Sequence, residues 1–207
     1  DKKSVETAFQ VTCQLAAKKV PVDPSKLEEA VRIEASELYA SYETYPFTKQ
    51  IGINPFEGLW GTFDDEGELF QKIKNIVPAY RREAWTKGLL RVGIDDAELG
   101  EQLADHFPIA RKAHPFLYQE TIQVLDRLKD SYQLVLLTNG SPSLQQTKLE
   151  ITAEIVPYFS HIVISGAFGK GKPDPSIFQY ALAKCNLNAD EVIMVGDNLM
   201  TDILGAS

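Results

Sequence analysis

The sequence predicts an α/β protein in which a parallel sheet core is combined with an all-helical domain. Two observations lead to this prediction. Residues 4 to about 110 carry apolar side chains at helical spacing, whereas short apolar runs alternate with helical segments from His114 on. Strands that alternate with helices form βαβ crossovers, which give a parallel sheet covered on both faces. We therefore expect a helical domain over residues 1–112 and an α/β domain over residues 113–207.

The helical domain is predicted from apolar residues that recur every three to four positions. Four segments have this spacing, residues 4–16, 25–42, 68–90 and 95–113. Ser4 is a candidate N-cap for the first of them. Residues 45–67 are dense in Gly, Pro and aromatic side chains, which indicates an irregular loop between the second and third helices.

The α/β domain is predicted to alternate helices with short apolar strands. The helices are expected over residues 118–130, from about 144 to about 154 after a polar turn at 139–143, and over 176–186, and the strands over residues 133–138, 161–165 and 191–196. A glycine-rich loop, residues 166–175, follows the second strand. Ligands of such sheets bind outside the carboxyl ends of the strands, so polar residues that follow each strand are the first candidates for a site.

Composition and charge narrow the class of protein. The 207-residue chain is 44% hydrophobic and 24% charged, which is ordinary for globular proteins, and its net charge is -8. Nucleic acids and anionic membranes require a basic face, so we expect neither as a partner. No apolar stretch approaches the roughly 20 residues of a membrane helix, and the N-terminus has no signal-peptide core. Two cysteines without metal-type spacing fit a reducing compartment, which predicts a cytoplasmic protein.

Polar residues follow each predicted strand at the same edge of the sheet. They are Thr138, Asn139 and Gly140 after the first strand, Lys172 in the loop after the second, and Asp197 and Asp202 after the third. Each has a purely structural alternative. The turn after Thr138 can serve only to start a helix with Ser141 as N-cap, and Lys172 can be a solvated loop lysine. Asp197 can cap the following helix, with Asp202 in its first turns. Their joint occurrence at three strand ends favours one shared site.

The residue types in this set suit phosphoryl transfer. A lysine, a hydroxyl and backbone amides stabilise the charge on the equatorial oxygens of a phosphoryl group. Mg²⁺ keeps several waters and takes one or two protein carboxylates, so Asp197 and Asp202 suffice beside a third acid. The sequence therefore predicts a magnesium-assisted phosphoryl site whose nucleophile is still to be found.

Three of these stretches carry a family resemblance. "LLTNG" at residues 136–140, "GKPDP" at residues 171–175 and "MVGDNLMTD" at residues 194–202 resemble motifs two, three and four of the haloacid dehalogenase-like hydrolase superfamily. The motifs occur in order and at suitable separations. The resemblance implies a Rossmann-like parallel sheet core, with the helical segment before it as an inserted all-helical cap domain.

The resemblance also implies a role for each residue of the set. The phosphate would be held by Thr138, Asn139, Gly140 and Lys172. Thr138 and Lys172 would be the catalytic residues. Lys172 would neutralise the charges of the phosphate and the nucleophile together. Asp197 would ligate Mg²⁺ directly, and Asp202 would support the ion through water or by orienting Lys172.

One part of the family pattern is missing. The first motif, Asp-x-Asp-x-Thr, supplies the nucleophilic aspartate of the family and is absent from the 207 residues. In the family it ends a central strand that lies between those corresponding to residues 133–138 and 191–196. Without that strand the remaining strands would not pair into one sheet. We therefore expect this chain to be a fragment of a longer protein, with Asp1 a few residues after the motif and a further strand beyond Ser207.

The resemblance implies a magnesium-dependent phosphomonoesterase that acts on a small phosphorylated metabolite through an aspartyl-phosphate intermediate. Phosphoserine is the specific prediction, and the protein is expected to be a monomer or a homodimer. Haloacid dehalogenases need no magnesium and do not keep the acidic pattern of the fourth motif, so Asp197 and Asp202 favour a phosphatase. A dehalogenase stays open as an alternative, as does a non-catalytic protein of this fold that binds or regulates.

Aromatic and basic residues of the helical domain are candidates for recognising the leaving group. They are Tyr45, Phe47, Lys49, Trp60, Arg81, Arg82 and Trp85. An arginine among them would suit a carboxylate. The alternative, that the tryptophans form the core and the arginines are solvated, is at least equally supported by the sequence.

Overall fold

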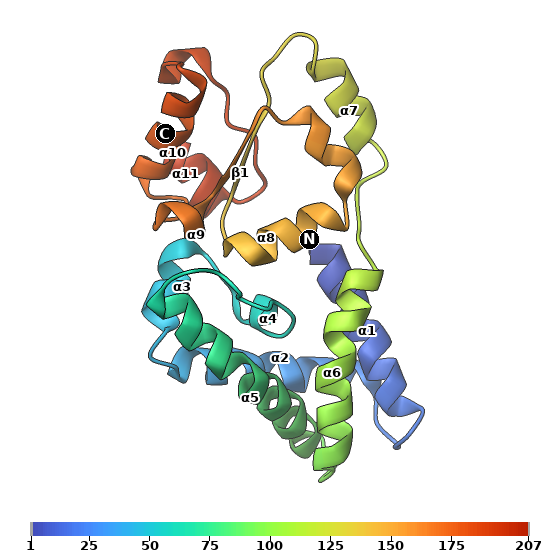
Figure 1. Cartoon of the computed structure of the whole chain (residues 1–207). Helices are drawn as coiled ribbons and strands as arrows, with labels where there is room; N and C mark the ends of the chain where they lie inside the picture. Colours follow the sequence, from blue (N-terminus) through green and yellow to red (C-terminus); the bar gives the residue numbers. More distant parts are fainter. Residues whose placement is uncertain (1, 207) are drawn as a thin grey trace. The chain divides into compact units, whose positions relative to one another are not determined.

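The computed structural model describes residues 2–206 and divides into two compact units (Figure 1). The helical unit extends to Pro46 and continues over Asn54–Phe116. The second unit contains Phe47–Ile53 and the chain from Leu117 on. The second unit thus includes residues 47–53, a grouping that had no counterpart in the sequence prediction.

Four helices form the frame of the helical unit. They are α1 (Lys2–Ala17), α2 (Pro24–Ser41), α5 (Glu68–Arg91) and α6 (Ala97–Ala113). Each packs on the next around a closed cycle, α1 on α2, α2 on α5, α5 on α6 and α6 on α1. Asp23 and Asp96 cap α2 and α6 by accepting hydrogen bonds from backbone N–H groups of the first turn. Ser4 is not the cap of α1, because the helix begins at Lys2 and Ser4 is buried within it.

Aromatic side chains fill the space between these helices. Trp85 of α5 is fully buried, and its ring centroid lies 5.9 Å from that of Phe9 and 5.7 Å from that of Phe107. Phe9 and Phe107 are 4.6 Å apart, so the three rings form one cluster contributed by three helices. Rings at such separations pack favourably in offset or tilted arrangements. The cluster is therefore the centre of the helical core.

The segment expected to be an irregular loop over residues 45–67 contains two short helices. They are α3 (Tyr45–Ile51) and α4 (Pro55–Gly58). A capping box starts α4, because the Asn54 side chain accepts from the Glu57 N–H and the Glu57 carboxylate accepts from the Asn54 N–H. Pro55 takes the first helical position, where its missing N–H is harmless. The high content of Gly and Pro led to the prediction of a loop, although the capping box and Pro55 are signals of a helix start.

A parallel pair of strands is the centre of the second unit. Strand β1 (Val135–Thr138) pairs with β2 (His161–Ile164), with Val135 opposite His161 and Thr138 opposite Ile164. The crossover between them consists of α8 (Pro142–Glu150) and the 3₁₀ helix η1 (Ala153–Tyr158). Both strands were predicted, and the α/β fold class with its parallel sheet is confirmed.

The remaining elements of this unit are helical. They are α7 (Thr121–Leu128), α9 (Ser165–Phe168), α10 (Pro175–Cys185), η2 (Ala189–Glu191), the π-helical turn η3 (Leu199–Ile203) and α11 (Leu204–Ala206). The helix α9 lies where the sequence indicated only a glycine-rich loop. Gly169 ends it in the left-handed conformation, with φ +98°, so the glycines of this stretch include a helix terminus.

The predicted third strand over residues 191–196 is not formed. Residues 192–196 make no ladder with β1 or β2, and the side chains of Ile193 and Val195 are 83% and 86% exposed. A strand requires a neighbour to satisfy its backbone N–H and C=O groups. The apolar character of the run is that of a buried strand, but no adjacent strand among residues 2–206 is available to pair with it.

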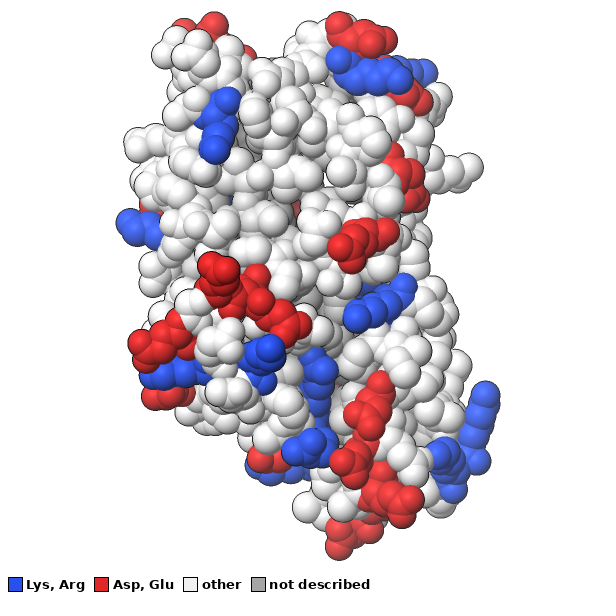
Figure 2. Space-filling view, viewed as in Figure 1, with Lys and Arg blue, Asp and Glu red and all other residues white. Residues whose placement is uncertain are grey.

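Charged side chains of both signs are interspersed on the face shown in Figure 2. Exposed ion pairs of the helical unit include Lys74 with Asp64 at 2.6 Å and Lys87 with Glu83 at 3.3 Å. Such exposed pairs contribute little to stability. Over residues 2–206, no helix combines the length and the apolar character that crossing a membrane requires.

Candidate active site at the strand ends

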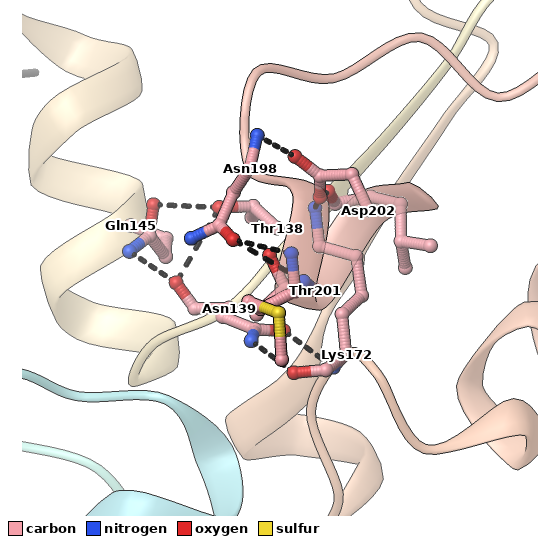
Figure 3. A network of polar contacts seen from close by, with 9 residues as sticks. Thr138, Asn139, Gln145, Lys172, Asn198, Thr201 and Asp202 are labelled. Atoms are coloured by element: carbon pink, nitrogen blue, oxygen red, sulfur yellow. Dashed lines mark hydrogen bonds and ion pairs between the residues drawn. The ribbon is translucent and has the colours of Figure 1, made fainter. Parts of the chain in front are cut away.

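Four of the six predicted site residues belong to one network of polar contacts, shown in Figure 3. Thr138 is the last residue of β1, and Asn139 follows it directly. Lys172 lies in the loop between α9 and α10, and Asp202 lies in η3. The network therefore joins segments that are far apart in sequence at the carboxyl end of β1, as the topology of a parallel sheet predicts.

Lys172 is the central cation of the network. Its Nζ donates to the backbone carbonyl of Leu137 at 2.9 Å and lies 2.6 Å from Oδ1 of Asp202. The side chains of Lys172 and Asp202 are 11% and 7% exposed. Lys172 is therefore not a solvated loop lysine, because its ammonium is held against the end of β1 by a carbonyl and a carboxylate.

Asn139 connects the end of β1 to the backbone of Lys172. The Asn139 Nδ2 group donates to the Lys172 carbonyl at 2.9 Å, and the Lys172 N–H donates to Asn139 Oδ1 at 2.8 Å. Both ends of the carboxamide are thus used in a reciprocal pair. The Asn139 side chain consequently fixes the loop from which the Lys172 side chain extends, and its carboxamide is not free to contact a ligand.

Thr138 forms hydrogen bonds with a residue that the sequence did not single out. Its hydroxyl donates to Oε1 of Gln145 at 3.1 Å, and Nε2 of Gln145 donates to the Asn139 carbonyl at 2.9 Å. Gln145 is buried in the first turns of α8, which is capped by Ser141 through the Leu144 N–H at 3.2 Å. The predicted N-cap role of Ser141 is confirmed. No signal in the sequence distinguishes Gln145, because its burial and its two hydrogen bonds depend on the fold.

Gly140 is placed beside Thr138, but its N–H has other partners. It donates to Ser165 Oγ at 2.8 Å and to the carbonyl of Ile51 at 3.1 Å. The Ser165 hydroxyl in turn donates to the same Ile51 carbonyl at 2.5 Å. The predicted phosphate contact through the Gly140 N–H would require these bonds to break, so Thr138 and the N–H of Asn139 are the better candidates in this turn.

Asp202 is held on both carboxylate oxygens. Oδ1 faces Lys172, and Oδ2 accepts from the backbone N–H of Asn198 at 3.1 Å. Gly196 makes this approach possible, because a Cβ at that position would lie 2.3 Å from Oδ2 of Asp202. Burial raises the pKa of Asp202, but hydrogen bonds from Lys172 and Asn198 outweigh it, so the pKa lies below its ordinary value.

Asp197 lies outside the network. Its side chain is exposed, and within residues 2–206 its carboxylate takes part in no hydrogen bond or ion pair. Asn198, and not Asp197, caps the following turn by accepting from the N–H groups of Met200 and Thr201. Over the same residues, no group of three or more His, Cys, Asp or Glu side chains is arranged to hold a metal ion.

The lowered pKa of Asp202 predicts a stability that depends on pH. The folded-state pKa lies below the unfolded value of about 3.9, so the ionised carboxylate stabilises the fold above that pH, and this contribution is lost as the pH falls through the folded pKa. We expect the free energy of unfolding of wild type to exceed that of Asp202→Asn at pH 6 and the difference to shrink below about pH 4. Urea titrations in EDTA measure it, and a constant difference would contradict the assignment.

The residues considered for recognising the leaving group are divided between core and surface. Trp60 and Trp85 are buried in the helical core, as the alternative of tryptophans in the core expected. Arg81 donates to the carbonyls of Gly58 and Gly61 and is a structural side chain of the helical unit. The side chains that remain exposed or half-buried are Tyr45, Phe47, Lys49 and Arg82.

Comparison with known proteins adds a family match to this geometry. A family model described as a haloacid dehalogenase-like hydrolase matches residues 7–207. The phosphoserine phosphatase of Thermus thermophilus is 31% identical over 176 residues, which are 85% of this chain and 69% of that protein. The glyceraldehyde 3-phosphate phosphatase of Pyrococcus abyssi is 44% identical over 85 residues, 41% of this chain and 35% of that protein.

Further similarity comes from a mammalian protein and from solved structures. The N-acylneuraminate-9-phosphatase of Mus musculus is 31% identical over 67% of this chain and 56% of its own length, so the chain spans only part of these relatives. The structure of the magnesium-bound HAD-hydrolase YfnB of Bacillus subtilis matches with a TM-score of 0.60 and 16% identity, covering 99% of this chain and 75% of that one. A 2-haloacid dehalogenase of Pseudomonas syringae pv. Tomato DC3000 matches with a TM-score of 0.54 and 22% identity, covering 98% and 74%. At these identities the structures establish the fold alone.

Proposed function

The chain belongs to the haloacid dehalogenase-like hydrolases, and we propose that it contributes the phosphate-binding and metal-binding residues of a magnesium-dependent phosphomonoesterase. The observation that carries the proposal is the Lys172–Asp202 pair, held at 2.6 Å beside the Thr138 hydroxyl network at the carboxyl end of β1. A fixed ammonium and a hydroxyl at one strand end are suited to stabilise negative charge on phosphoryl oxygens.

Within this proposal each residue has a separate task. Lys172 neutralises the charge of the phosphoryl group, and its hydrogen bond to the Leu137 carbonyl keeps the ammonium at the strand end. Thr138 and the N–H of Asn139 bind phosphoryl oxygens, for which the Thr138 hydroxyl proton turns from Gln145 toward the ligand. The family's nucleophile motif, Asp-x-Asp-x-Thr, does not occur in the printed sequence, so these residues account for binding and charge stabilisation.

The acidic residues differ in how they fit a magnesium ion. The exposed Asp197 carboxylate has no partner within residues 2–206 and suits an ion that takes one or two carboxylates and several waters. Asp202 has both oxygens engaged, which favours its orienting Lys172 over direct ligation. A bound Mg²⁺ supplies positive charge to the phosphoryl oxygens. We therefore assign direct ligation to Asp197 and the supporting role to Asp202.

The proposed substrate is a small phosphorylated metabolite, and phosphoserine is the first to test. The support is the 31% identity to a phosphoserine phosphatase over 85% of this chain. The glyceraldehyde 3-phosphate and N-acylneuraminate 9-phosphate phosphatases name two further candidates among small phosphomonoesters. We propose that the helical unit is the cap of this enzyme and that the exposed Lys49, which belongs to the same unit as the strand ends, is a candidate for recognising the leaving group.

Phosphate release from para-nitrophenyl phosphate tests the proposal. We expect the full-length protein to turn over this ester steadily with Mg²⁺, and EDTA or Asp197→Ala to lower the rate by at least about 100-fold, because charge stabilisation at the phosphoryl group is lost. Asp190→Ala is the matched control, since Asp190 is an exposed acid in η2 of the same unit. Its rate should stay at the wild-type level.

Two other results would select the alternatives. Halide release from a 2-haloacid that survives EDTA would assign a dehalogenase. No turnover of phosphoserine, glyceraldehyde 3-phosphate, N-acylneuraminate 9-phosphate or a broad panel of phosphorylated metabolites would favour a binding or regulatory protein. Turnover of one panel member with the highest kcat/KM identifies the substrate.

A further inference from the structure

Gln145 occupies a position in the site that neither the sequence motifs nor the family match assigns. It is buried in α8, and both ends of its carboxamide contact the turn that follows β1. We propose that Gln145 is a positioning residue, which clamps the Asn139–Gly140 peptide and sets the direction of the Thr138 hydroxyl. The inference rests on the proposed function, because it deepens the description of the same phosphate-binding turn.

The orientation of the Gln145 carboxamide follows from its partners. The Asn139 carbonyl can only accept a hydrogen bond, so the Gln145 NH₂ group must face it, at 2.9 Å. Oε1 then faces Thr138 Oγ1 at 3.1 Å, and the hydroxyl must donate. The hydroxyl also lies 3.5 Å from the Asn139 carbonyl, but the shorter contact to Oε1 sets the resting position of the Thr138 proton. When a phosphoryl oxygen binds, this proton turns to it, while Gln145 still holds the Asn139 carbonyl.

The peptide between Asn139 and Gly140 is held from both sides. In a planar trans peptide the C=O and N–H groups point in opposite directions. Gln145 binds the carbonyl side, and the buried Ser165 Oγ accepts from the Gly140 N–H at 2.8 Å. The clamp also explains why residue 140 is a glycine, because a Cβ there would lie 2.2 Å from Gln145 Nε2. The φ of +138° is a second reason, since it disfavours residues other than glycine.

The clamp extends to the central cation. Asn139, whose carbonyl is bound by Gln145, uses its side chain to hold both backbone groups of Lys172, at 2.9 and 2.8 Å. The sequence of contacts from Gln145 through Asn139 to Lys172 and Asp202 is continuous in Figure 3. Displacement of a reacting group by about 1 Å can cost on the order of 100-fold in rate. A residue that never touches substrate can therefore affect turnover through this turn.

The experiment compares wild type with Gln145→Leu and Gln145→Glu in the full-length protein, using para-nitrophenyl phosphate. Leucine fills a similar volume without hydrogen bonds, so we expect kcat to fall by on the order of 100-fold, with a smaller change in KM. A glutamate offers one donor and one acceptor only when protonated, and burial raises its pKa from about 4.3. The ratio of its kcat to wild type should rise as the pH is lowered, whereas the leucine ratio stays flat.

The ratio of variant kcat to wild-type kcat cancels the pH dependence that comes from Lys172 and Asp202, the charged groups joined to the turn. Both groups are present in wild type, Gln145→Leu and Gln145→Glu. Gln146→Leu is the matched control, since Gln146 is the next residue of α8 but is exposed, and within residues 2–206 its side chain bonds only to Glu150. Its kcat should equal that of wild type. A wild-type kcat in Gln145→Leu, or a flat ratio in Gln145→Glu, would overturn the positioning role.

Failure of the proposed function gives a different result. If wild type turns over no phosphomonoester, the phosphatase proposal fails, and the clamp is judged by NMR hydrogen exchange of the Gly140 amide. That exchange should be faster in Gln145→Leu than in wild type and unchanged in Gln146→Leu. Equal exchange in all three proteins would overturn the clamp.

Discussion

Replacing Lys172 by Met is expected to lower kcat for phosphomonoester hydrolysis by roughly 100- to 1,000-fold, the range found when one preorganised electrostatic contact is removed. The Lys172 Nζ lies 2.6 Å from Asp202 Oδ1 and 2.9 Å from the Leu137 carbonyl, so no other cation of the network can replace it. The loss should appear mainly in kcat, because the ammonium acts on charge that develops during the reaction. Steady-state kinetics at saturating substrate measure it.

The same substitution should destabilise the protein. The methionine side chain would leave the nearly buried Asp202 carboxylate without its cation, and breaking a buried pair from one side costs about 3 kcal/mol or more. The double variant Lys172→Met with Asp202→Asn should recover much of the stability but none of the activity. Lys170→Met is the matched control, because Lys170 is exposed in the same loop and pairs with Asp174. Wild-type kcat in Lys172→Met would refute the role of Lys172.

Replacing Trp85 by Ala is expected to lower the free energy of unfolding of the helical unit by about 3 to 5 kcal/mol. Trp85 is fully buried, with the rings of Phe9 and Phe107 at 5.9 and 5.7 Å, so the substitution opens a cavity between three helices. Chemical denaturation followed by circular dichroism at 222 nm measures the change, because this signal reports helix content.

Trp85→Phe and Leu90→Ala provide the controls for this prediction. Phenylalanine keeps the ring contacts and should cost much less than alanine, because a smaller volume is lost. Leu90 lies on the same helix but is exposed, so its truncation should change the unfolding free energy by no more than about 0.5 kcal/mol. Equal destabilisation by Trp85→Ala and Leu90→Ala would show that the aromatic cluster is not the centre of the core.

The sequence predicted the main helices and the two strands because each has a strong local period. The runs that became β1 and β2 are apolar and lie between helical segments, and the topology then places Thr138 and Lys172 at one edge. Family membership was predicted from three ordered motifs, and the match over residues 7–207 confirms it. Local patterns of this kind are sufficient for the fold class and the family, but they did not place Asp197, which lies outside the network.

The features that escaped prediction depend on partners distant in sequence. The run at residues 191–196 has the composition of a strand, but pairing is decided by a neighbour and not by composition. Gln145 has no motif of its own, and its role becomes visible only when its two hydrogen bonds are known. Trp60 and Trp85 were candidates both for the core and for recognising the leaving group until the packing of the helical unit was known.

The short segment Phe47–Ile53 determines how this molecule can be taken apart. It is interior to the helical sequence, yet its backbone carbonyls at Gln50 and Ile51 accept from the N–H groups of Gly171 and Gly140 in the second unit. The chain therefore passes between units after Pro46, after Ile53 and after Phe116. Cutting the protein at the last of these points would divide the second unit and leave buried donors without acceptors. Dissection of the two units thus requires a circularly permuted or grafted chain that carries residues 47–53 with the sheet.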